Sequence, residues 1–195
     1  MNSAAVKSRL RKSTLLERDA LNIDDRLSWD EAIIERVLAL PQVVATKGPV
    51  AGYWQMRSEV DIRPVLADLS KRGVQTCLPA IVDDELSFRN WTPWEAVVPG
   101  CFGTLAPPAD QEVVSPALLL VPVAAFDRRG ARIGYGKGYY DRAMVRLGAA
   151  NPGLVAIGIA YSAQEVEQVP LEPWDRRLTL IATEKETVAP KPALR

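Results

Sequence analysis

The sequence predicts a single three-layer α/β/α domain built on a mainly parallel, Rossmann-like sheet. Short apolar runs that suit buried strands alternate with segments whose apolar residues recur at helical spacing. Short connections join these segments, as in parallel βαβ crossovers. The 195 residues can build one sizeable core but are too few for two independent enzyme domains. We therefore expect one domain over residues 1–195, with 188–195 as a loose tail.

Two helices are expected at the start of the chain. Residues 3–21 fit an amphipathic helix. Its apolar residues are four leucines, with three basic residues between them: Leu10, Leu15, Leu16 and Leu21, and Lys7, Arg11 and Arg18. A second helix begins near Asp24 or Asp25, either of which can cap it, and runs to Leu40, because Pro41 prevents continuation.

A parallel crossover is expected next. Residues 49–54 form a short apolar run that predicts a buried strand, and residues 62–72 have helical periodicity that ends at Gly73. Residues 74–78 predict a second strand, which Pro79 should stop. This strand–helix–strand order with short connections is typical of a βαβ unit.

The second half of the chain repeats the alternation of strands and helices. Between the two halves, residues 92–116 are rich in Pro and Gly but keep aromatic residues, so we expect an ordered excursion. The remaining expected elements are strands at 85–91, 118–123, 154–160 and 178–182, and a helix at 139–147.

Composition excludes several classes of function. Lys plus Arg (24) balance Asp plus Glu (24), so we expect no nucleic-acid partner. Histidine is absent, which excludes Ser-His-Asp and Cys-His nucleophiles and His-ligated zinc. No apolar run approaches the roughly 20 residues that span a bilayer, and the charged start does not resemble a signal peptide. We expect a cytoplasmic protein without membrane contact, as a monomer or weak dimer.

A glycine-rich segment follows the most apolar predicted strand. Gly134, Gly136 and Gly138 occupy alternate positions immediately before a predicted helix. Glycines allow backbone N–H groups to approach an anion closely, and a helix N-terminus adds partial positive charge. This order of strand, glycines and helix predicts a phosphate site.

Charged residues surround these glycines. Arg132 and Lys137 can donate charge-assisted hydrogen bonds to phosphate oxygens. Asp141 falls in the first turn of the predicted helix, where it could hold a Mg²⁺ that bridges the phosphates. An isolated glycine turn with surface charges would be the simpler interpretation, but the strand-to-helix context and the charges together favour phosphate binding.

The segment fits neither common nucleotide motif. Walker A requires a glycine five positions before Gly136 and Ser or Thr after Lys137, but Ala131 and Gly138 stand there. The dinucleotide fingerprint, counted from Gly134, requires a third glycine where Tyr139 stands. A nicotinamide-dependent oxidoreductase would need that spacing, so it is the least favoured alternative.

Residues 121–142, VPVAAFDRRGARIGYGKGYYDR, resemble the signature of the 5-formyltetrahydrofolate cyclo-ligase (5,10-methenyltetrahydrofolate synthetase) family. Further segments resemble that family in the same order along nearly the whole chain: 7–11, 18–21, 59–62, 88–91, 100–103, 169–175 and 183–184. Several separate matches in order are more specific than any one of them. Two positions depart from the family pattern, Ala106 and Trp174, and we expect both to concern the substrate side.

The resemblance implies an ATP- and Mg²⁺-dependent ring closure. The family transfers the γ-phosphoryl group of ATP to the formyl oxygen on N5 of 5-formyltetrahydrofolate. N10 then attacks the activated carbon, which releases phosphate and forms 5,10-methenyltetrahydrofolate beside ADP. Such chemistry suits a chain without histidine, because phosphoryl transfer depends mainly on positioning and charge neutralisation. The alternative is a folate- or nucleotide-binding paralogue that lacks this activity or has another substrate.

The resemblance also implies roles for individual residues. ATP is expected at Lys7, Arg11, Arg132, Gly134, Gly136, Lys137, Gly138 and Tyr139, with Arg132 and Lys137 catalytic. Mg²⁺ is expected at Asp141 and Asp175, and the folate at Trp54, Glu59, Trp91 and Tyr140. Without the resemblance, the Lys7 and Arg11 pair would be interpreted as a solvated basic helix face, and Trp54 equally well as a core residue.

Overall fold

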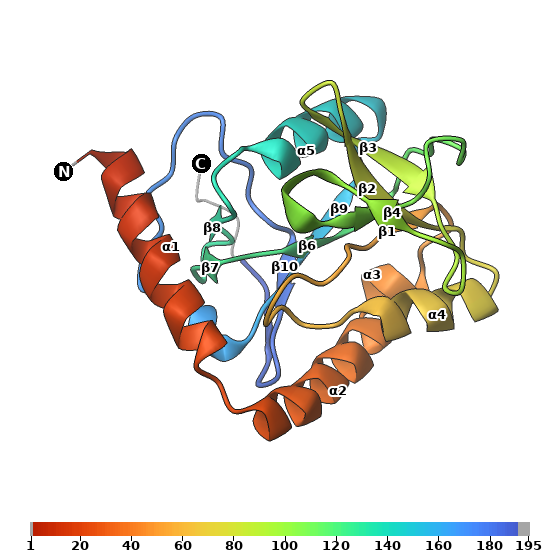
Figure 1. Ribbon diagram of the computed structural model, residues 1–195. Helices are drawn as coiled ribbons and strands as arrows, with labels where there is room; N and C mark the ends of the chain where they lie inside the picture. The colour runs from red at the N-terminus through yellow and green to blue at the C-terminus, as the bar shows by residue number, and fades with distance from the viewer. Residues whose placement is uncertain (1, 191–195) are drawn as a thin grey trace.

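The computed structural model describes residues 2–190, in which helices cover both faces of a seven-stranded sheet (Figure 1). The helices are α1 (Ser3–Asp19), α2 (Ile23–Ala39), α3 (Pro41–Val44), α4 (Arg63–Lys71) and α5 (Tyr139–Ala150), with short 3-10 helices η1 (Cys101–Gly103) and η2 (Ser162–Gln164). The strands are β1 (Val50–Ala51), β2 (Thr76–Val82), β3 (Glu85–Asn90), β4 (Val98–Pro99), β5 (Leu105–Ala106), β6 (Leu118–Pro122), β7 (Ala125–Phe126), β8 (Arg132–Ile133), β9 (Val155–Ile159), β10 (Leu180–Ala182) and β11 (Thr187–Val188).

The large sheet confirms the mainly parallel α/β prediction. Its strand order is β11-β10-β9-β6-β1-β2-β3. Every neighbouring pair from β10 to β2 is parallel, whereas the edge strands β3 and β11 run antiparallel to their neighbours. The β1–α4–β2 unit is the predicted crossover, with Val50 paired to Thr76.

The two faces of the sheet carry separate cores. Successive side chains of a strand point to opposite faces, so Leu118 and Leu120 of β6 join one core and Leu119 and Val121 the other. Helices α2, α3 and α4 cover the first core, and α5 covers the second. These are the predicted three layers. Within residues 2–190 no helix is long and apolar enough to cross a membrane.

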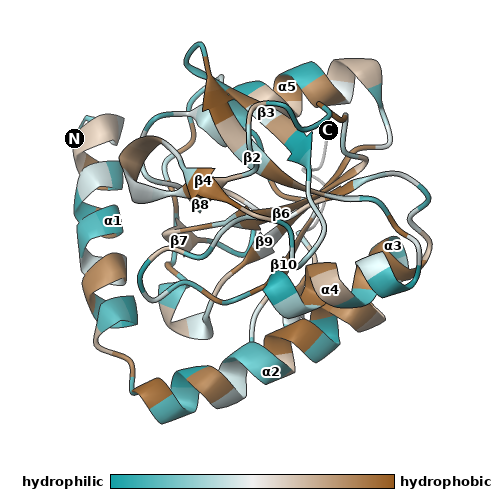
Figure 2. Cartoon of the chain, turned by 45° about the vertical axis from the view of Figure 1, so that its right-hand side comes forward, coloured by the Kyte–Doolittle hydropathy of each residue, from teal (hydrophilic) through white to brown (hydrophobic). Residues whose placement is uncertain are grey.

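Helix α1 is the first predicted helix, and its fully buried residues are polar. The buried residues of α1 are Thr14 and Arg18, whereas Leu16 is 61% exposed. The helix does not lie on the sheet. It packs beside the β7–β8 hairpin and η2, where Leu10 joins a small core (Figure 1). Hydrophilic residues recur along its length in Figure 2. The helix therefore buries both polar and apolar residues against the body of the protein.

Several predicted boundaries were wrong. Strand β1 ends at Ala51 rather than residue 54, although the Gly52 N–H still donates to the Cys77 carbonyl (3.0 Å). Strand β2 continues through Pro79 to Val82. It can do so because β1 pairs with β2 only as far as Cys77, so Pro79 lies beyond that neighbour and its missing N–H breaks no bond to β1.

Residues 92–116 and the start of the predicted tail contain regular secondary structure. Residues 92–116 contain the small β4–β5 ladder and η1. The prediction of a loose tail from 188 was wrong at its start, because Val188 is buried and pairs with Ile181 in the sheet. The rest of that prediction falls on residues 189–195, of which 191–195 lie outside the described part of the chain.

Gly52 should not tolerate a side chain. An alanine Cβ there would lie 2.6 Å from Leu66 Cδ1 and 2.7 Å from Ile62 Cδ1, so these two buried side chains would have to shift within the core. We expect Gly52→Ala to lower the free energy of unfolding by about 1–3 kcal/mol, measured by urea denaturation. Gly148→Ala is the control. It lies in α5 with nothing within 4 Å of its Cβ, so it should stabilise by about 0.5–1 kcal/mol. Equal effects would contradict the steric argument.

Candidate functional site

The order of strands in the sheet reverses between β1 and β6. From β1 the chain continues to β2 and β3 on one side, and from β6 it continues to β9, β10 and β11 on the other. In open α/β sheets ligands bind outside the carboxyl ends of the strands at such a reversal. The segment after β1 carries Trp54 and Glu59, and the segment after β6 leads to the glycines. The fold therefore brings both groups of predicted site residues to one edge.

The β7–β8 hairpin presents the glycine segment. Its turn is organised by the buried carboxylate of Asp127, which accepts hydrogen bonds from the backbone N–H groups of Arg129 (2.9 Å) and Val169 (2.9 Å). Gly136 and Gly138 then adopt left-handed backbone, with φ of 95° and 67°. Side chains strain such backbone, so the spacing of these glycines follows from the path of the chain. Gly138 is the N-cap of α5.

Arg11 of α1 lies against this glycine segment. Its Nε donates to the Gly134 carbonyl (2.6 Å), and a Cβ on Gly136 would lie 3.2 Å from Arg11 Nη2. Burial lowers the pKa of Arg11. The structure thus places a cation from the first helix beside the glycines, as the sequence predicted.

Lys7, one helical turn earlier, contacts the closing segment of the chain. Its Nζ donates to Glu172 Oε2 (2.8 Å) and Asp175 Oδ2 (2.5 Å). Burial alone would lower the pKa of Lys7, but the bonds to Asp175 and Glu172 outweigh it and raise that pKa. Lys7 is therefore a charged group held between two carboxylates, of which Glu172 has no role predicted from sequence.

Arg132 and Asp141 form a partly buried ion pair. Their Nη2 and Oδ1 atoms are 3.0 Å apart, and the Arg176 N–H also donates to Asp141 Oδ1 (2.9 Å). Burial lowers the pKa of Arg132, while Asp141 and Asp175 oppose that shift. The structure thus pairs Arg132 directly with Asp141.

The carboxylate pair suits Mg²⁺ only together with a ligand. Within residues 2–190 no group of three or more His, Cys, Asp or Glu side chains could hold a metal by itself. In this part of the chain, Asp141 Oδ2 and Asp175 Oδ1 form no hydrogen bond. Mg²⁺ is commonly bound by one or two carboxylates plus substrate phosphates, so the two residues fit that mode.

Lys137 and Tyr139 lie next to Phe102, which belongs to η1 in the segment 92–116. Phe102 of η1 is 62% exposed and has a φ of 58°. Its ring centroid lies 5.6 Å from Lys137 Nζ and 6.4 Å from the Tyr139 ring. The Tyr139 hydroxyl donates to Asp84 Oδ1 (2.9 Å). Lys137 itself is exposed, as expected for a group that meets a ligand, and Phe102 is a neighbour that we did not predict.

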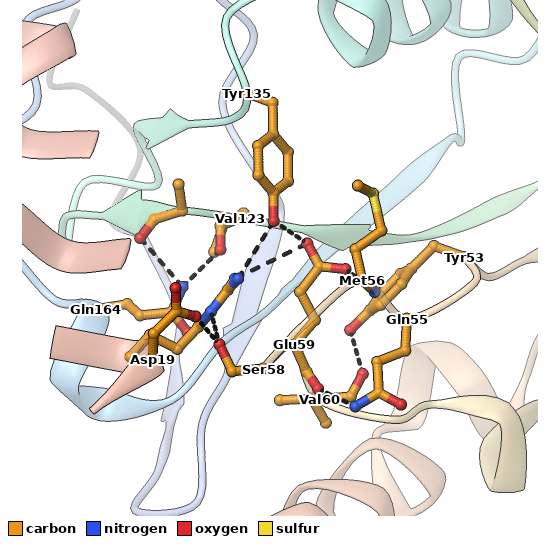
Figure 3. A network of polar contacts seen from close by, with 12 residues as sticks. Asp19, Tyr53, Gln55, Met56, Ser58, Glu59, Val60, Val123, Tyr135 and Gln164 are labelled. Atoms are coloured by element: carbon orange, nitrogen blue, oxygen red, sulfur yellow. Dashed lines mark hydrogen bonds and ion pairs between the residues drawn. The ribbon is translucent and has the colours of Figure 1, made fainter. Parts of the chain in front are cut away.

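Glu59 lies in a buried polar network (Figure 3). The Tyr135 hydroxyl donates to its Oε1 (2.7 Å), the Met56 N–H donates to its Oε2 (2.9 Å), and Arg18 Nη1 lies 3.8 Å from Oε1. Burial raises the pKa of Glu59, and these three neighbours oppose the rise. Arg18 also donates to Ser58 Oγ (3.0 Å). Glu59 is thus a carboxylate held in one position.

The two tryptophans lie together but differ in accessibility. The rings of Trp54 and Trp91 meet edge to face, with centroids 6.1 Å apart. Arg63 Cζ lies 4.9 Å from the centre of the Trp54 ring, which is partly exposed. Trp91 is buried and donates from Nε1 to the Glu95 carbonyl (3.2 Å). Its fixed ring therefore packs against the less accessible side of Trp54.

Tyr140 is partly buried and packs against the core that α5 covers. Burial raises its pKa, the charge of Glu59 adds to that rise, and the charge of Arg132 opposes it.

Two residues that contact Glu59, Arg18 and Tyr135, were not predicted from the sequence. Lys7, Arg11 and Arg18 are separated by four and seven residues, which brings all three to one helix face. That face was the available signal for Arg18. Tyr135 carried none, because its partner Glu59 lies 76 residues away in the chain.

The two positions that depart from the family pattern differ in exposure. Trp174 is 64% exposed and lines a pocket of about 350 Å³ with Asp141, Val145 and Arg176. It therefore lies beside a residue that is expected to bind Mg²⁺. Ala106 is buried in β5.

Comparisons with known proteins identify the family of this chain. A sequence model of the 5-formyltetrahydrofolate cyclo-ligase family matches residues 3–184. The 5-formyltetrahydrofolate cyclo-ligase of Mycoplasma genitalium is 31% identical over 180 residues, which cover 90% of this chain and 96% of that protein. The Escherichia coli K12 protein of the same name is 28% identical over 173 residues, covering 85% and 93%. A solved structure of 5,10-methenyltetrahydrofolate synthetase from Aquifex aeolicus is 32% identical, with a TM-score of 0.83 over 97% of this chain and 95% of that one.

Proposed function

Because the chain belongs to the 5-formyltetrahydrofolate cyclo-ligase family of enzymes, we propose that it closes 5-formyltetrahydrofolate to 5,10-methenyltetrahydrofolate with consumption of ATP. The observation that carries the proposal is the meeting of two groups at the β1–β6 reversal. One is the basic glycine segment, and the other is the fixed carboxylate of Glu59, which a hydrogen bond from Tyr135 joins.

The nucleotide half would act through positioning and charge. Phosphoryl transfer to the formyl oxygen requires neutralisation of the phosphates and alignment of the two reactants. Arg11 and Lys137 flank the glycines, whose N–H groups and the α5 N-terminus add further positive potential. Asp141 and Asp175 would hold Mg²⁺, which supplies charge neutralisation between phosphate oxygens when bound.

The folate half would orient the pterin and its formyl group. A pterin is flat and apolar on its faces and carries donors on its edge, so an aromatic wall beside a carboxylate suits it. Trp54 offers the wall and Glu59 the acceptor. The formyl oxygen would then attack the γ-phosphorus and displace ADP. Attack by N10 on the activated carbon would release phosphate and complete the ring.

The direct test is turnover. Purified protein with 5-formyltetrahydrofolate, ATP and Mg²⁺ is expected to produce the absorbance of the methenyl product at a rate on the order of 1 s⁻¹ or above. Omission of ATP and chelation of Mg²⁺ are the controls, and each should abolish the signal. Absence of product from protein that binds both substrates would contradict the proposal and favour a binding paralogue. The observation that supports this alternative is the exposed Trp174 beside Asp141, which departs from the family pattern.

A further inference from the structure

The Tyr135 hydroxyl joins the glycine segment directly to the Glu59 carboxylate, which we propose to bind the substrate. It donates to Glu59 Oε1 (2.7 Å) and accepts a hydrogen bond from Arg18 Nη2 (3.3 Å). Figure 3 shows Tyr135 reaching down to the Glu59 carboxylate from a separate segment of the chain. Tyr135 itself is 42% exposed, so its ring is at the surface while its hydroxyl enters the network.

We propose that Tyr135 is a positioning residue that orients Glu59 toward the folate, with Arg18 orienting Tyr135 in turn. This rests on the proposed function, because it assigns Glu59 to substrate binding. Arg18 is fully buried and its Nε bond to Ser58 directs its guanidinium, so the Tyr135 hydroxyl meets a fixed cation. Ser58 donates in turn to Asp19 of α1. The network is therefore continuous from α1 through Arg18 and Tyr135 to Glu59.

Tyr135 is the member of the network that can be changed without removing a buried charge. Glu59 Oε2 is held by the backbone N–H of Met56, which belongs to the same short segment. Oε1 has no backbone donor among the described residues and depends on Tyr135 and Arg18. Removal of the Tyr135 hydroxyl would thus free one carboxylate oxygen without removing a buried charge. A hydrogen bond to a charged group contributes enough to change binding roughly 10-fold or more.

Tyr135→Phe tests the proposal. The ring is partly exposed, so the variant should fold. We expect its Kd for 5-formyltetrahydrofolate, measured by calorimetry without ATP, to rise about 10-fold. The KM for the folate should rise by a similar factor, while kcat and the KM for ATP change less than about threefold. Tyr161→Phe is the matched control, because it removes a hydroxyl bonded to another carboxylate, Asp30, which is not among the predicted site residues.

A pH profile separates positioning from general loosening. The groups that face Glu59 are Arg18, Tyr135, Tyr53 and Tyr140. The bond from Tyr135 lowers the pKa of Glu59, so Tyr135→Phe should raise it. If the ionised carboxylate binds folate, the acid limb of kcat/KM should move to higher pH in this variant. A structural defect alone would not move that limb.

The outcomes distinguish this inference from the proposed function. If the wild-type protein binds the folate but forms no product, the proposed function fails and the binding measurements still test Tyr135. If Tyr135→Phe matches the wild type in Kd and in its acid limb, the positioning role is overturned. The same conclusion follows if Tyr161→Phe weakens folate binding equally, or if the wild-type protein does not bind the folate.

Discussion

Replacement of Lys137 by alanine is expected to lower kcat/KM for ATP by roughly 10²–10³-fold, the effect typical of losing one donor that stabilises a transition state. Lys137 is exposed beside the glycines, and its one aromatic neighbour among the described residues is Phe102, 5.6 Å from Nζ. Its positive charge therefore remains available to phosphate oxygens. If Lys137 acts on the transferred group, kcat should fall as well as the affinity for ATP.

The fold should not change in this variant. Lys137 is exposed and forms no ion pair with residues 2–190, so it contributes little to stability and the urea midpoint should match that of the wild type. Lys47→Ala is the control for general charge effects, because Lys47 is also exposed but lies in the segment before β1. Unchanged turnover and nucleotide affinity in Lys137→Ala would remove this residue from the site.

Replacement of Arg18 by alanine is expected to lower the free energy of unfolding by about 3–5 kcal/mol. Arg18 and Glu59 retain only 1% and 4% exposure of their side chains, and their closest charged atoms are 3.8 Å apart. Removal of the arginine would leave the Glu59 carboxylate buried with hydrogen bonds from Tyr135 and Met56 but no cation. Urea denaturation at neutral pH measures the loss.

The pH dependence of this loss follows from the raised pKa of Glu59. Without Arg18, which lowers that pKa, it should rise further above the unfolded value. The folded variant would then bind its proton more readily than the unfolded chain. The deficit in stability relative to the wild type should therefore be full above the folded pKa of the variant and shrink as the pH falls toward the folded pKa of the wild type.

Arg128→Ala provides the contrast. Arg128 pairs with both Glu165 and Glu186, so it makes more ion pairs than Arg18. Its side chain is 55% exposed, however, and solvent screens such pairs. We expect no resolved change in the urea midpoint. A larger effect from Arg128→Ala than from Arg18→Ala would contradict the argument that burial determines the cost.

Much of the fold could be predicted from local patterns. The βαβ unit around α4 followed from periodicity and from Gly73, both of which are local signals. The glycine segment was recognisable because its left-handed glycines and the following helix lie within a few residues. The boundaries of β1 and β2 were not predictable, because Pro79 is tolerated only where the neighbouring strand has already ended.

The surface that α1 meets was decided by the tertiary structure. The predicted amphipathic helix is present, and Leu10 and Leu21 pack against cores, yet Leu16 is exposed and Arg18 is buried. A helix that lies on a sheet buries apolar residues, whereas α1 lies at the site edge and meets carboxylates and backbone carbonyls. The periodicity identified the helix but could not identify the surface that it meets.

The sequence by itself determined the order of the elements, the glycine segment with its charges, and the family to which these belong, since all three are written in short, contiguous motifs. Only the tertiary structure decided which of these residues meet. Tyr135 and Glu59 lie 76 residues apart, and Lys7 and Asp175 lie 168 apart. Such pairs form because the strand order reverses between β1 and β6, which brings distant segments to one edge of the sheet.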